Sequence, residues 1–458
     1  MMIAPEKFLT ESLLRSSMGA DICQVLASAI NQADPAAAIK RNISRIDNQL
    51  IFSDKVIDLD TFSRIFVIGA GKAVVPMVSA LSDILLPHVT TGVIITKDGY
   101  VYPSMLSSES RIEMFEAGHP LPDQRNLQAS SSVVSLVKNV KIDDLVICLI
   151  SGGASSLLIK PSSDLSVQDI HTLTSLLLSC GASIDELNTI RKHLDDFKGG
   201  GLAKLLFPAT IVSLILSDVI GDRLDMVASG PTVADPTSYA DAWSILEKYQ
   251  IVGHVSERIR VHLKNGISGI IPETVKLGDS ILENVTNILI GNNSQTMKAA
   301  SDAAEKLGYT PKIITTNLHG EASQVGQTLS AIAISSLTQN NMHPICLIAG
   351  GETTVTIKGS GKGGRNQELA LGAVLGLSAT PHELVLVSLA TDGGDGPTDA
   401  AGAVATNQTF SRGERLGLHP QDYLQRNDSY HYFEILGDLI KTGPTLTNVN
   451  DLALIFIA

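Results

Sequence analysis

The chain has 458 residues, which is too many for one ordinary hydrophobic core, so we expect two domains. Its 34 basic and 47 acidic residues give a net charge of -13, which argues against a general nucleic-acid-binding surface and against attachment to anionic membranes. Hydrophobic residues make up 44% of the chain and aromatic residues only 4%, so aliphatic side chains must fill the interior, as they do in parallel sheets buried on both faces.

The cysteines and the N-terminus indicate a cytoplasmic protein. Cys23, Cys148, Cys180 and Cys346 lie far apart, lack CxxC spacing and fall mostly in apolar runs, which favours buried, reduced thiols. Residues 1–7 lack the charged and apolar regions of a signal peptide, and no window approaches the roughly 18 apolar residues of a membrane span.

In chain order, residues 9–32 carry apolar side chains at helical spacing and predict an amphipathic helix. Apolar strand-like runs then alternate with helical patterns. The strand-like runs are 64–70, 92–96, 111–116, 145–150 and 210–217, and after a restart 287–291, 312–315, 344–349, 354–358, 384–390 and 452–457. The region 239–278 has weaker periodicity, so we place the domain boundary there, between residues 1–245 and 246–458. The pattern predicts two α/β lobes with largely parallel, Rossmann-like sheets that face a central cleft.

Glycine-rich loops with polar or charged residues follow five of the apolar runs. These loops are 69–72, 151–156, 217–222, 350–354 and 391–396. Ligands bind at the carboxyl ends of the strands in open parallel sheets, so we interpret the five loops together as functional, although any one of them alone is more typical of a structural turn.

The first loop fits neither common nucleotide motif. Ala73 stands where a Walker A motif needs Ser or Thr, and Val74 breaks the pattern G-x-G-x-x-G. Lys72 still requires an explanation, because a lysine at a helix start opposes the helix dipole and needs an anionic partner, unless it is simply a solvated surface residue.

The stretch 359–368 satisfies G-x-G-x-x-G through Gly359, Gly361 and Gly364, after one strand-like run and before a helical one. Its glycines and the helix start predict an anion site, and Arg365 adds a guanidinium that can grip a carboxylate or a phosphate. The acidic residue that a dinucleotide site needs about 20 positions later is not cleanly present. We therefore favour a clamp for a transferring phosphoryl group.

Several aspartates in these loops could hold Mg²⁺ or accept a hydroxyl proton. We favour such a role for Asp218 and Asp392, and capping for Asp395. The 151–156 loop lacks G-x-S-x-G, so its backbone N–H groups are expected to cradle phosphate. No His or Cys motif predicts zinc, and His119 lies either near a substrate or in a rigid turn.

These motifs together resemble the class II glycerate 2-kinases, whose C-terminal part is a MOFRL domain. The matching segments are 69–73, 116–120, 151–153, 198–202, 217–219, 228–232, 350–353, 361–368 and 391–393, in the family's order. Residues 237–284 match least. The resemblance implies transfer of phosphate from ATP to the 2-hydroxyl of D-glycerate with a divalent metal, which we expect to be Mg²⁺.

The resemblance also implies a catalytic pair, Lys72 and Arg365. From it and the loops we also predict four roles for site residues. Asp218 is catalytic; Gly69, Gly71, Ser151, Gly152, Gly153, Gly361, Gly363 and Gly364 bind the nucleotide; Lys72, Arg365, Glu352 and His119 bind the substrate; and Asp218 and Asp392 bind the metal.

Two other functions stay open. An NAD(P)H-dependent hydroxypyruvate reductase is favoured by G-x-G-x-x-G and opposed by the missing ribose-binding acid. A non-catalytic sugar-acid sensor would bind a ligand without turnover. The expected partners are the small molecules D-glycerate and ATP, without nucleic acid or membrane; a homodimer is compatible with the sequence.

Overall fold

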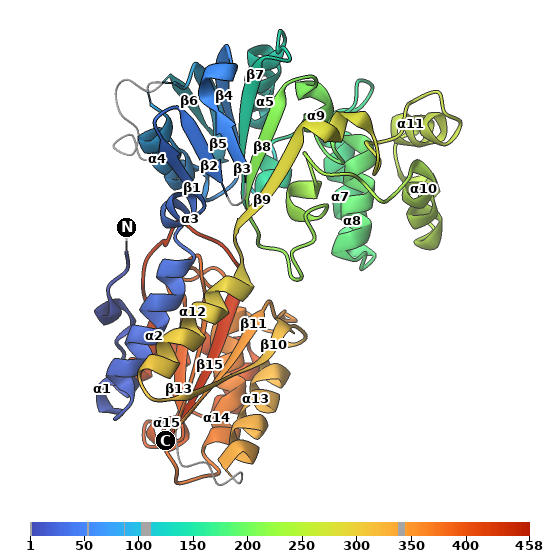
Figure 1. Ribbon diagram of the computed structural model, residues 1–458. Helices are drawn as coiled ribbons and strands as arrows, with labels where there is room; N and C mark the ends of the chain where they lie inside the picture. The colour runs from blue at the N-terminus through green and yellow to red at the C-terminus, as the bar shows by residue number, and fades with distance from the viewer. Residues whose placement is uncertain (1, 53–54, 87, 102–110, 338–343) are drawn as a thin grey trace. The chain divides into compact units, whose positions relative to one another are not determined.

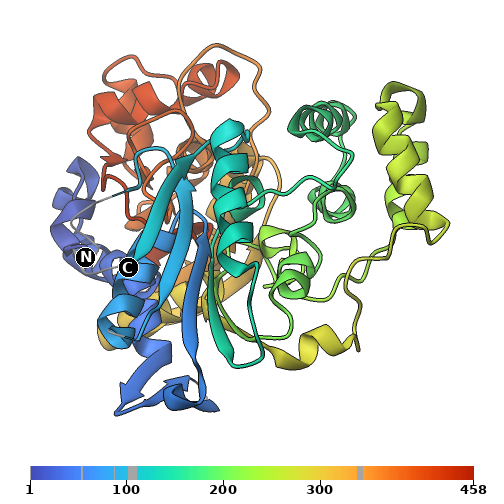
Figure 2. The same ribbon diagram turned by 90° about the horizontal axis from the view of Figure 1, so that it is seen from above.

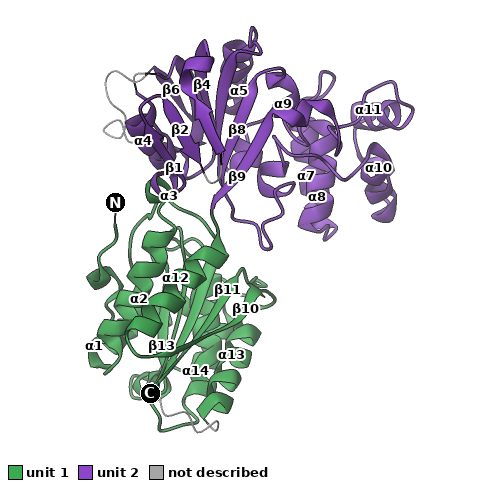
Figure 3. Ribbon diagram, in the orientation of Figure 1, with its two compact units in different colours: residues 1–37, 291–458 green, residues 38–290 purple. Residues whose placement is uncertain are grey.

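The computed structural model describes residues 2–52, 55–86, 88–101, 111–337 and 344–458. The chain forms two compact units: unit 1 comprises residues 1–37 and 291–458, and unit 2 comprises residues 38–290 (Figure 3). This division differs from the expected boundary at 245/246, which falls inside helix α10 (Tyr239–Lys248). The weak periodicity of residues 239–278 belongs to a helical layer of unit 2, because Ile245 packs in a cluster with Leu173, Leu187 and Ile259.

Unit 2 is built on a six-stranded sheet with the strand order β6-β5-β4-β7-β8-β9. Its strands are β4 (Arg64–Ala70), β5 (Thr91–Lys97), β6 (Ile112–Ala117), β7 (Asp144–Ile150), β8 (Thr210–Leu216) and β9 (Val285–Gly291). The neighbouring pairs from β6 to β8 are parallel, and Ala70 is in register with Ile150. The loops after β4 and β7 therefore leave the sheet at the same edge.

Helices cover this sheet and extend to one side of it. They are α4 (Val74–Leu85), α5 (Gln124–Val137), α6 (Ala154–Leu157), α7 (Val167–Ser179), α8 (Ile184–Leu194), α9 (Gly201–Leu206), α10 and α11 (Glu257–Ile267). Figure 2 shows α5 along the face of the sheet, with α7, α8, α10 and α11 beside it. Capping boxes begin α5, α7, α8 and α10 and satisfy their first backbone N–H groups. A small antiparallel sheet joins β1 (Ile43–Ile46), β2 (Gln49–Phe52) and β3 (Lys55–Asp58).

Unit 1 contains the second six-stranded sheet, with the order β10-β11-β15-β12-β13-β14. Its strands are β10 (Thr310–Leu318), β11 (Ile345–Gly351), β12 (Leu384–Ala390), β13 (Gly402–Thr406), β14 (Leu439–Ile440) and β15 (Asp451–Ile457). Only β10 and β11 pair in parallel; the other pairs are antiparallel. The prediction of largely parallel sheets is thus correct for unit 2 and wrong for unit 1, because the closing strand β15 inserts between β11 and β12 in the opposite direction.

Two layers of helices enclose the sheet of unit 1 (Figure 1). The helices are α1 (Glu11–Arg15), α2 (Gly19–Gln32), α12 (Asn293–Lys306), α13 (Ala322–Leu337), α14 (Arg365–Leu377), α15 (Thr409–Glu414), α16 (Pro420–Gln425) and α17 (Ser429–Leu436). The first sequence boundary between the units, after residue 37, falls within α3 (Pro35–Asn42). One core joins α13 and α14 to the sheet, and the other joins α2 and α12 to its opposite face. The predicted amphipathic helix over residues 9–32 is confirmed for α2, but the chain breaks at residues 16–18 and forms the separate short helix α1 before it. The burial of α2 against α12 explains why the N-terminus belongs to unit 1.

Short 3-10 helices complete the fold: η1 (Pro5–Phe8), η2 (Leu59–Thr61), η4 (Val227–Ser229), η5 (Val252–His254) and η6 (Ser280–Asn284). All four cysteines are free, and Cys23, Cys148 and Cys346 are buried as predicted, whereas Cys180 is partly exposed. In the part of the chain that the structure describes, no helix has the length and apolar character needed to cross a bilayer.

Candidate active site

The loops that follow β4 and β7 interlock at the carboxyl edge of the unit 2 sheet. The Lys72 amide donates to the Gly152 carbonyl at 2.9 Å, and the Ala73 amide donates to Ser151 Oγ at 3.0 Å. Gly71 has φ +135° and lies so close to Ser151 that a Cβ would be 2.1 Å from its Oγ. Only glycine meets both conditions, so Gly71 lets the two loops touch.

Lys72 and His119 both lie close to Gly153. Gly153 has φ +88°, and a Cβ on it would be 2.9 Å from His119 Nε2 and 3.3 Å from Lys72 Cγ. Among the described residues no acidic side chain pairs with Lys72, whose side chain is partly buried. The structure thus brings together Lys72, Gly153 and His119, as the sequence predicted, and leaves a cation without an anion.

The imidazole of His119 is held neutral. Burial, together with the nearby charges of Lys72 and Lys97, lowers the pKa of His119 to about 4. A neutral imidazole next to an ammonium group can hydrogen-bond a substrate hydroxyl or a phosphate without adding charge. Lys97, the last residue of β5, was not predicted; its position at the end of a parallel strand was the signal for it.

The predicted phosphate cradle after β7 is only partly free. The Ser151 amide donates to the Ala70 carbonyl at 3.1 Å, so it holds the two strands together. Within the described residues the Gly152 and Gly153 amides have no protein acceptor, and these two N–H groups remain for an oxyanion. Ser151 therefore supports the loop, while the glycines that follow it supply the free donors.

The carboxylate of Asp218 comes from the loop after β8, at the same edge of the sheet, and is partly buried. Magnesium in a kinase site takes one or two carboxylates and completes its shell with phosphate oxygens and water. A metal-binding role for Asp218 stays a prediction. The described residues contain no group of three or more His, Cys, Asp or Glu side chains that could hold a metal without a nucleotide.

Arg365 begins α14 in unit 1 and is held by two carboxylates. Its Nε and Nη2 donate to Asp451 at 2.5 and 2.9 Å, and its Nη1 donates to Glu352 at 2.6 Å. The side chain of Asp451 is 5% exposed and that of Glu352 is 45% exposed. Glu352, predicted to bind substrate, thus contacts Arg365 directly. Two of the five guanidinium N–H groups remain for a ligand.

Asp451 is the site residue that sequence reasoning missed. It is the first residue of β15 and pairs with Gly351 and Ala390, the last residues of β11 and β12. Burial raises the pKa of Asp451, and the hydrogen bonds from Arg365 oppose this rise. The available signal was an acidic residue at the start of an otherwise apolar strand. Had this strand been parallel to β11, Asp451 would have lain at the opposite edge of the sheet from Arg365.

The glycine-rich stretch before α14 packs against residues 426–429. The Lys358 and Gly359 amides donate to Asn427 Oδ1, the Gly361 amide donates to the Arg426 carbonyl, and the Lys362 amide donates to Asp428. A Cβ on Gly361 would be 2.5 Å from the Arg426 carbonyl oxygen. These contacts give the stretch a structural role and take up amides that a pyrophosphate would need.

The N-terminus of α14 already has an anion, the carboxylate of Asp395. Asp395 accepts from the Asn366 and Gln367 amides at 3.1 and 2.9 Å and is 2% exposed. Gly363 and Gly364 lie against Ser429 and Asp395 respectively, and a Cβ on either would be 2.3 Å from an atom of that partner. The predicted phosphate site at this helix start is therefore filled by the protein, and the capping role predicted for Asp395 is confirmed.

Asp392 accepts from the Gly394 amide at 3.0 Å, which is a turn-forming hydrogen bond, and its side chain is partly buried. This contact occupies one carboxylate oxygen and leaves the other for a ligand. A metal-binding role for Asp392 stays a prediction.

Comparison with known proteins identifies the family. Residues 21–264 match the family described as "Domain of unknown function (DUF4147)", and residues 345–451 match the MOFRL family. A glycerate 2-kinase of Pyrococcus horikoshii is 40% identical over 437 residues, covering 95% of this chain and 96% of that protein. The chain belongs to the MOFRL-domain glycerate 2-kinase family. The resemblance seen in the sequence is thereby confirmed.

Two further relatives carry names that refer to different reactions. The solved structure of a glycerate kinase from Thermotoga maritima has a TM-score of 0.82 and 38% identity, covering 95% of this chain and 98% of that chain. A protein of Agrobacterium vitis with the provisional name hydroxypyruvate reductase is 37% identical, covering 95% of this chain and 93% of that protein. The family thus includes a protein named for each of the two reactions considered from the sequence.

Proposed function

We propose that this protein transfers the γ-phosphoryl group of ATP to the 2-hydroxyl of D-glycerate, giving 2-phosphoglycerate and ADP. The observation that carries the proposal is the ammonium of Lys72, which no carboxylate of the described residues pairs, beside the Gly152 and Gly153 amides, which have no acceptor there, and a neutral His119. Phosphoryl transfer requires fixed positive charge and backbone donors around the phosphate oxygens, and this loop pair supplies both.

In the proposed reaction the 2-hydroxyl oxygen of glycerate attacks the γ-phosphorus, the bond to the bridging oxygen of ADP breaks, and the hydroxyl proton leaves to Asp218 or to water. Lys72 neutralises phosphate charge, and the neutral His119 orients the hydroxyl. Arg365, fixed by Asp451 and Glu352, contributes its two remaining N–H groups to the phosphoryl group or to the glycerate carboxylate.

When bound, Mg²⁺ would neutralise charge on the phosphates, with Asp218 as the first candidate ligand and Asp392 as the second. The Gly69–Lys72 and Ser151–Gly153 loops would hold the phosphates of the nucleotide. Gly361, Gly363 and Gly364 enter the proposal through the position of Arg365, because their close packing fixes the chain that leads into α14. The proposed setting is the cytoplasm, and a homodimer stays a prediction for analytical ultracentrifugation.

The test is coupled measurement of ADP release with D-glycerate, with NMR of the product. We expect Lys72→Met and Arg365→Met each to lower kcat/KM by about 10²-fold or more, as for other transition-state donors. Lys138→Met and Arg415→Met, at exposed positions of units 2 and 1, are the matched controls and should leave kcat/KM unchanged. Unchanged turnover in the Lys72 and Arg365 variants would contradict the proposal.

The reductase alternative is tested by following NADH absorbance with hydroxypyruvate. The packing of Gly359, Gly361 and Gly364 against residues 426–429 and Asp395 weighs against it, since these glycines carried the dinucleotide motif. Hydride transfer without ADP formation would favour the reductase. Binding of D-glycerate with neither reaction would favour the sensor.

A further inference from the structure

A cavity of about 210 Å³ lies in unit 2 between α6, α7, α8 and residues 120–122. One face of α7 forms a wall of it through Val167, Ile170, Thr174 and Leu178, whose spacing is that of a single helical face. We call this the α7 cavity. Its walls are mainly aliphatic, and α7 is fixed at its start by a capping box. A mostly apolar pocket with few polar groups is typical of a small-molecule site.

The charged group that sets this cavity apart is Arg191 of α8. Within the described ranges no carboxylate pairs with Arg191, and burial lowers the pKa of its guanidinium. Asp195, which also lines the cavity, is already engaged, because it accepts from Lys198 Nζ at 2.8 Å and from the Lys160 and Phe197 amides. A partly buried cation without a counterion is prepared for an anionic ligand.

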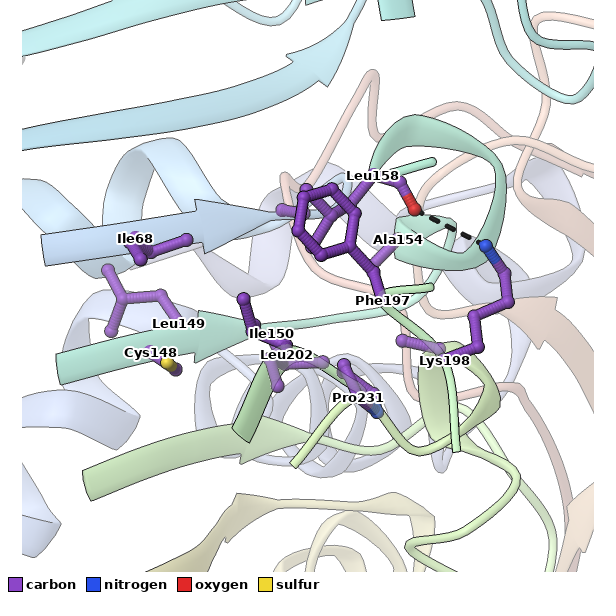
Figure 4. A pocket seen from close by; sticks show the side chains of 12 residues that line it. Ile68, Cys148, Leu149, Ile150, Ala154, Leu158, Phe197, Lys198, Leu202 and Pro231 are labelled. Atoms are coloured by element: carbon purple, nitrogen blue, oxygen red, sulfur yellow. Dashed lines mark hydrogen bonds between the residues drawn. The ribbon is translucent and has the colours of Figure 1, made fainter. Parts of the chain in front are cut away.

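Lys198 cannot serve in place of Arg191. Figure 4 shows its side chain directed towards the Leu158 carbonyl, to which Nζ donates at 3.3 Å. The space drawn there has a volume of only about 10 Å³, the size of one water molecule, and lies against the buried ends of β4 and β7. The ammonium of Lys198 thus serves internal hydrogen bonds, and Arg191 is the cation that faces the α7 cavity unpaired.

The α7 cavity adjoins the site formed by Lys72, Gly153 and His119. Ser155 and Ser156 line it and come two and three residues after Gly153, and Pro120 lines it and directly follows His119. Consecutive Cα atoms are about 3.8 Å apart, so the two sites adjoin. A ligand that fills the α7 cavity can therefore extend an anionic chain to Lys72.

These features favour a nucleotide over glycerate as the occupant. Glycerate is a small, polar three-carbon acid with no apolar part to bury against aliphatic walls. A nucleotide has a flat ring for such walls, an anionic group for a guanidinium and a polyphosphate long enough to continue to a neighbouring site. We propose that the α7 cavity binds the adenosine part of ATP, with Arg191 on the α-phosphate; this rests on the proposed function and names the nucleotide subsite within it.

The test is calorimetric binding of ADP and of adenosine to the full-length protein, beside the kinase assay. Thr174→Trp fills the cavity, and Thr172→Trp places the same side chain on the exposed face of the same helix. We expect Thr174→Trp to weaken both ADP and adenosine by at least about tenfold, and Thr172→Trp to change neither. The KM for D-glycerate should stay within about twofold in both variants.

Arg191→Gln is the second variant, because it leaves the cavity open. It should weaken ADP by about tenfold but not adenosine, and it should not lower the melting temperature of the ligand-free protein, since it removes an uncompensated charge. Arg258→Gln, at an exposed position of α11, is its control. A purely structural role for Arg191 would lower the melting temperature and affect both ligands alike.

The outcomes separate the two proposals. If the unmodified protein turns over D-glycerate and folded Thr174→Trp and Arg191→Gln keep full ADP affinity, the nucleotide subsite is wrong and the kinase stands. If there is no turnover but ADP binds and the variants weaken it, the subsite stands and the kinase reaction is wrong. If ADP does not bind to the unmodified protein, both are overturned.

Discussion

The same substitution, carboxylate to amide, should have very different effects on folding stability at the two residues that hold Arg365. Asp451→Asn and Glu352→Gln each replace a charged oxygen acceptor with a neutral amide of the same shape. Asp451 is 5% exposed and accepts two hydrogen bonds from Arg365, whereas Glu352 is 45% exposed and accepts one. Burial and hydrogen-bond number therefore both distinguish the two positions.

The size of each effect follows from burial. Breaking a buried ion pair costs about 3–5 kcal/mol, but the side chain of Arg365 is 33% exposed and regains some hydration, so we expect about 2–4 kcal/mol for Asp451→Asn. Burying the Asp451 carboxylate is itself unfavourable and raises its pKa. Because the Asn side chain removes this cost, the net loss of folding stability becomes smaller. For Glu352→Gln we expect at most about 1 kcal/mol, as for exposed pairs.

The assay is urea unfolding followed by far-UV circular dichroism, with Trp243 fluorescence as a separate probe. Trp243 is the only tryptophan of the chain and lies in unit 2, so its signal reports the unit that neither substitution touches. In the kinase assay, Asp451→Asn should lower kcat/KM by about 10²-fold, because the guanidinium loses its fixed orientation. Equal losses of stability in the two variants would refute the assignment of Asp451 as the main support of Arg365.

Three further predictions concern individual residues. Asp395→Asn should destabilise the protein by about 1–2 kcal/mol in urea unfolding, because the amides at the start of α14 lose their anion; an unchanged midpoint would contradict the cap. Gly153→Ala should lower kcat/KM at least about tenfold and leave the circular dichroism spectrum unchanged, because the new Cβ meets His119 and strains a residue at φ +88°. Full activity in this variant would show that the reaction does not need the arrangement of Lys72 and His119. His119 has a pKa of about 4 in the folded protein and about 6.5 in the unfolded chain. The free energy of unfolding should therefore be highest above pH 6.5 and fall by up to about 3 kcal/mol as the pH drops towards 4. His119→Gln should flatten this decline, and parallel profiles of unfolding free energy against pH in the two proteins would contradict the prediction.

Much of unit 2 could be predicted because its signals are local. Apolar runs such as residues 145–150 favour strands buried on both faces, and loops that follow parallel strands share one edge. Lys72, Ser151, Gly153 and His119 therefore came together as expected. The helical layer of residues 239–278 carried no comparable pattern, and its membership of unit 2 rests on packing against α7 and α8.

The stretch 359–368 shows the limit of motif reasoning. Its glycines match a phosphate-binding pattern, but the pattern does not record whether another part of the chain already supplies the acceptors. Here residues 426–428 and Asp395 supply them. The same glycines that free a backbone to approach a phosphate also allow it to approach another backbone.

The sequence alone determined the α/β class and the family, and it singled out Lys72 and Arg365 as candidate site residues, because these inferences depend on residue types at short spacing. Only the tertiary structure decided that β15 enters its sheet antiparallel, that Asp451 consequently meets Arg365, and that Arg191, beside an apolar cavity, has no counterion among the described residues. Such contacts join residues that are far apart in the chain, and they depend on strand direction and burial. A residue's sequence neighbours reveal neither strand direction nor burial.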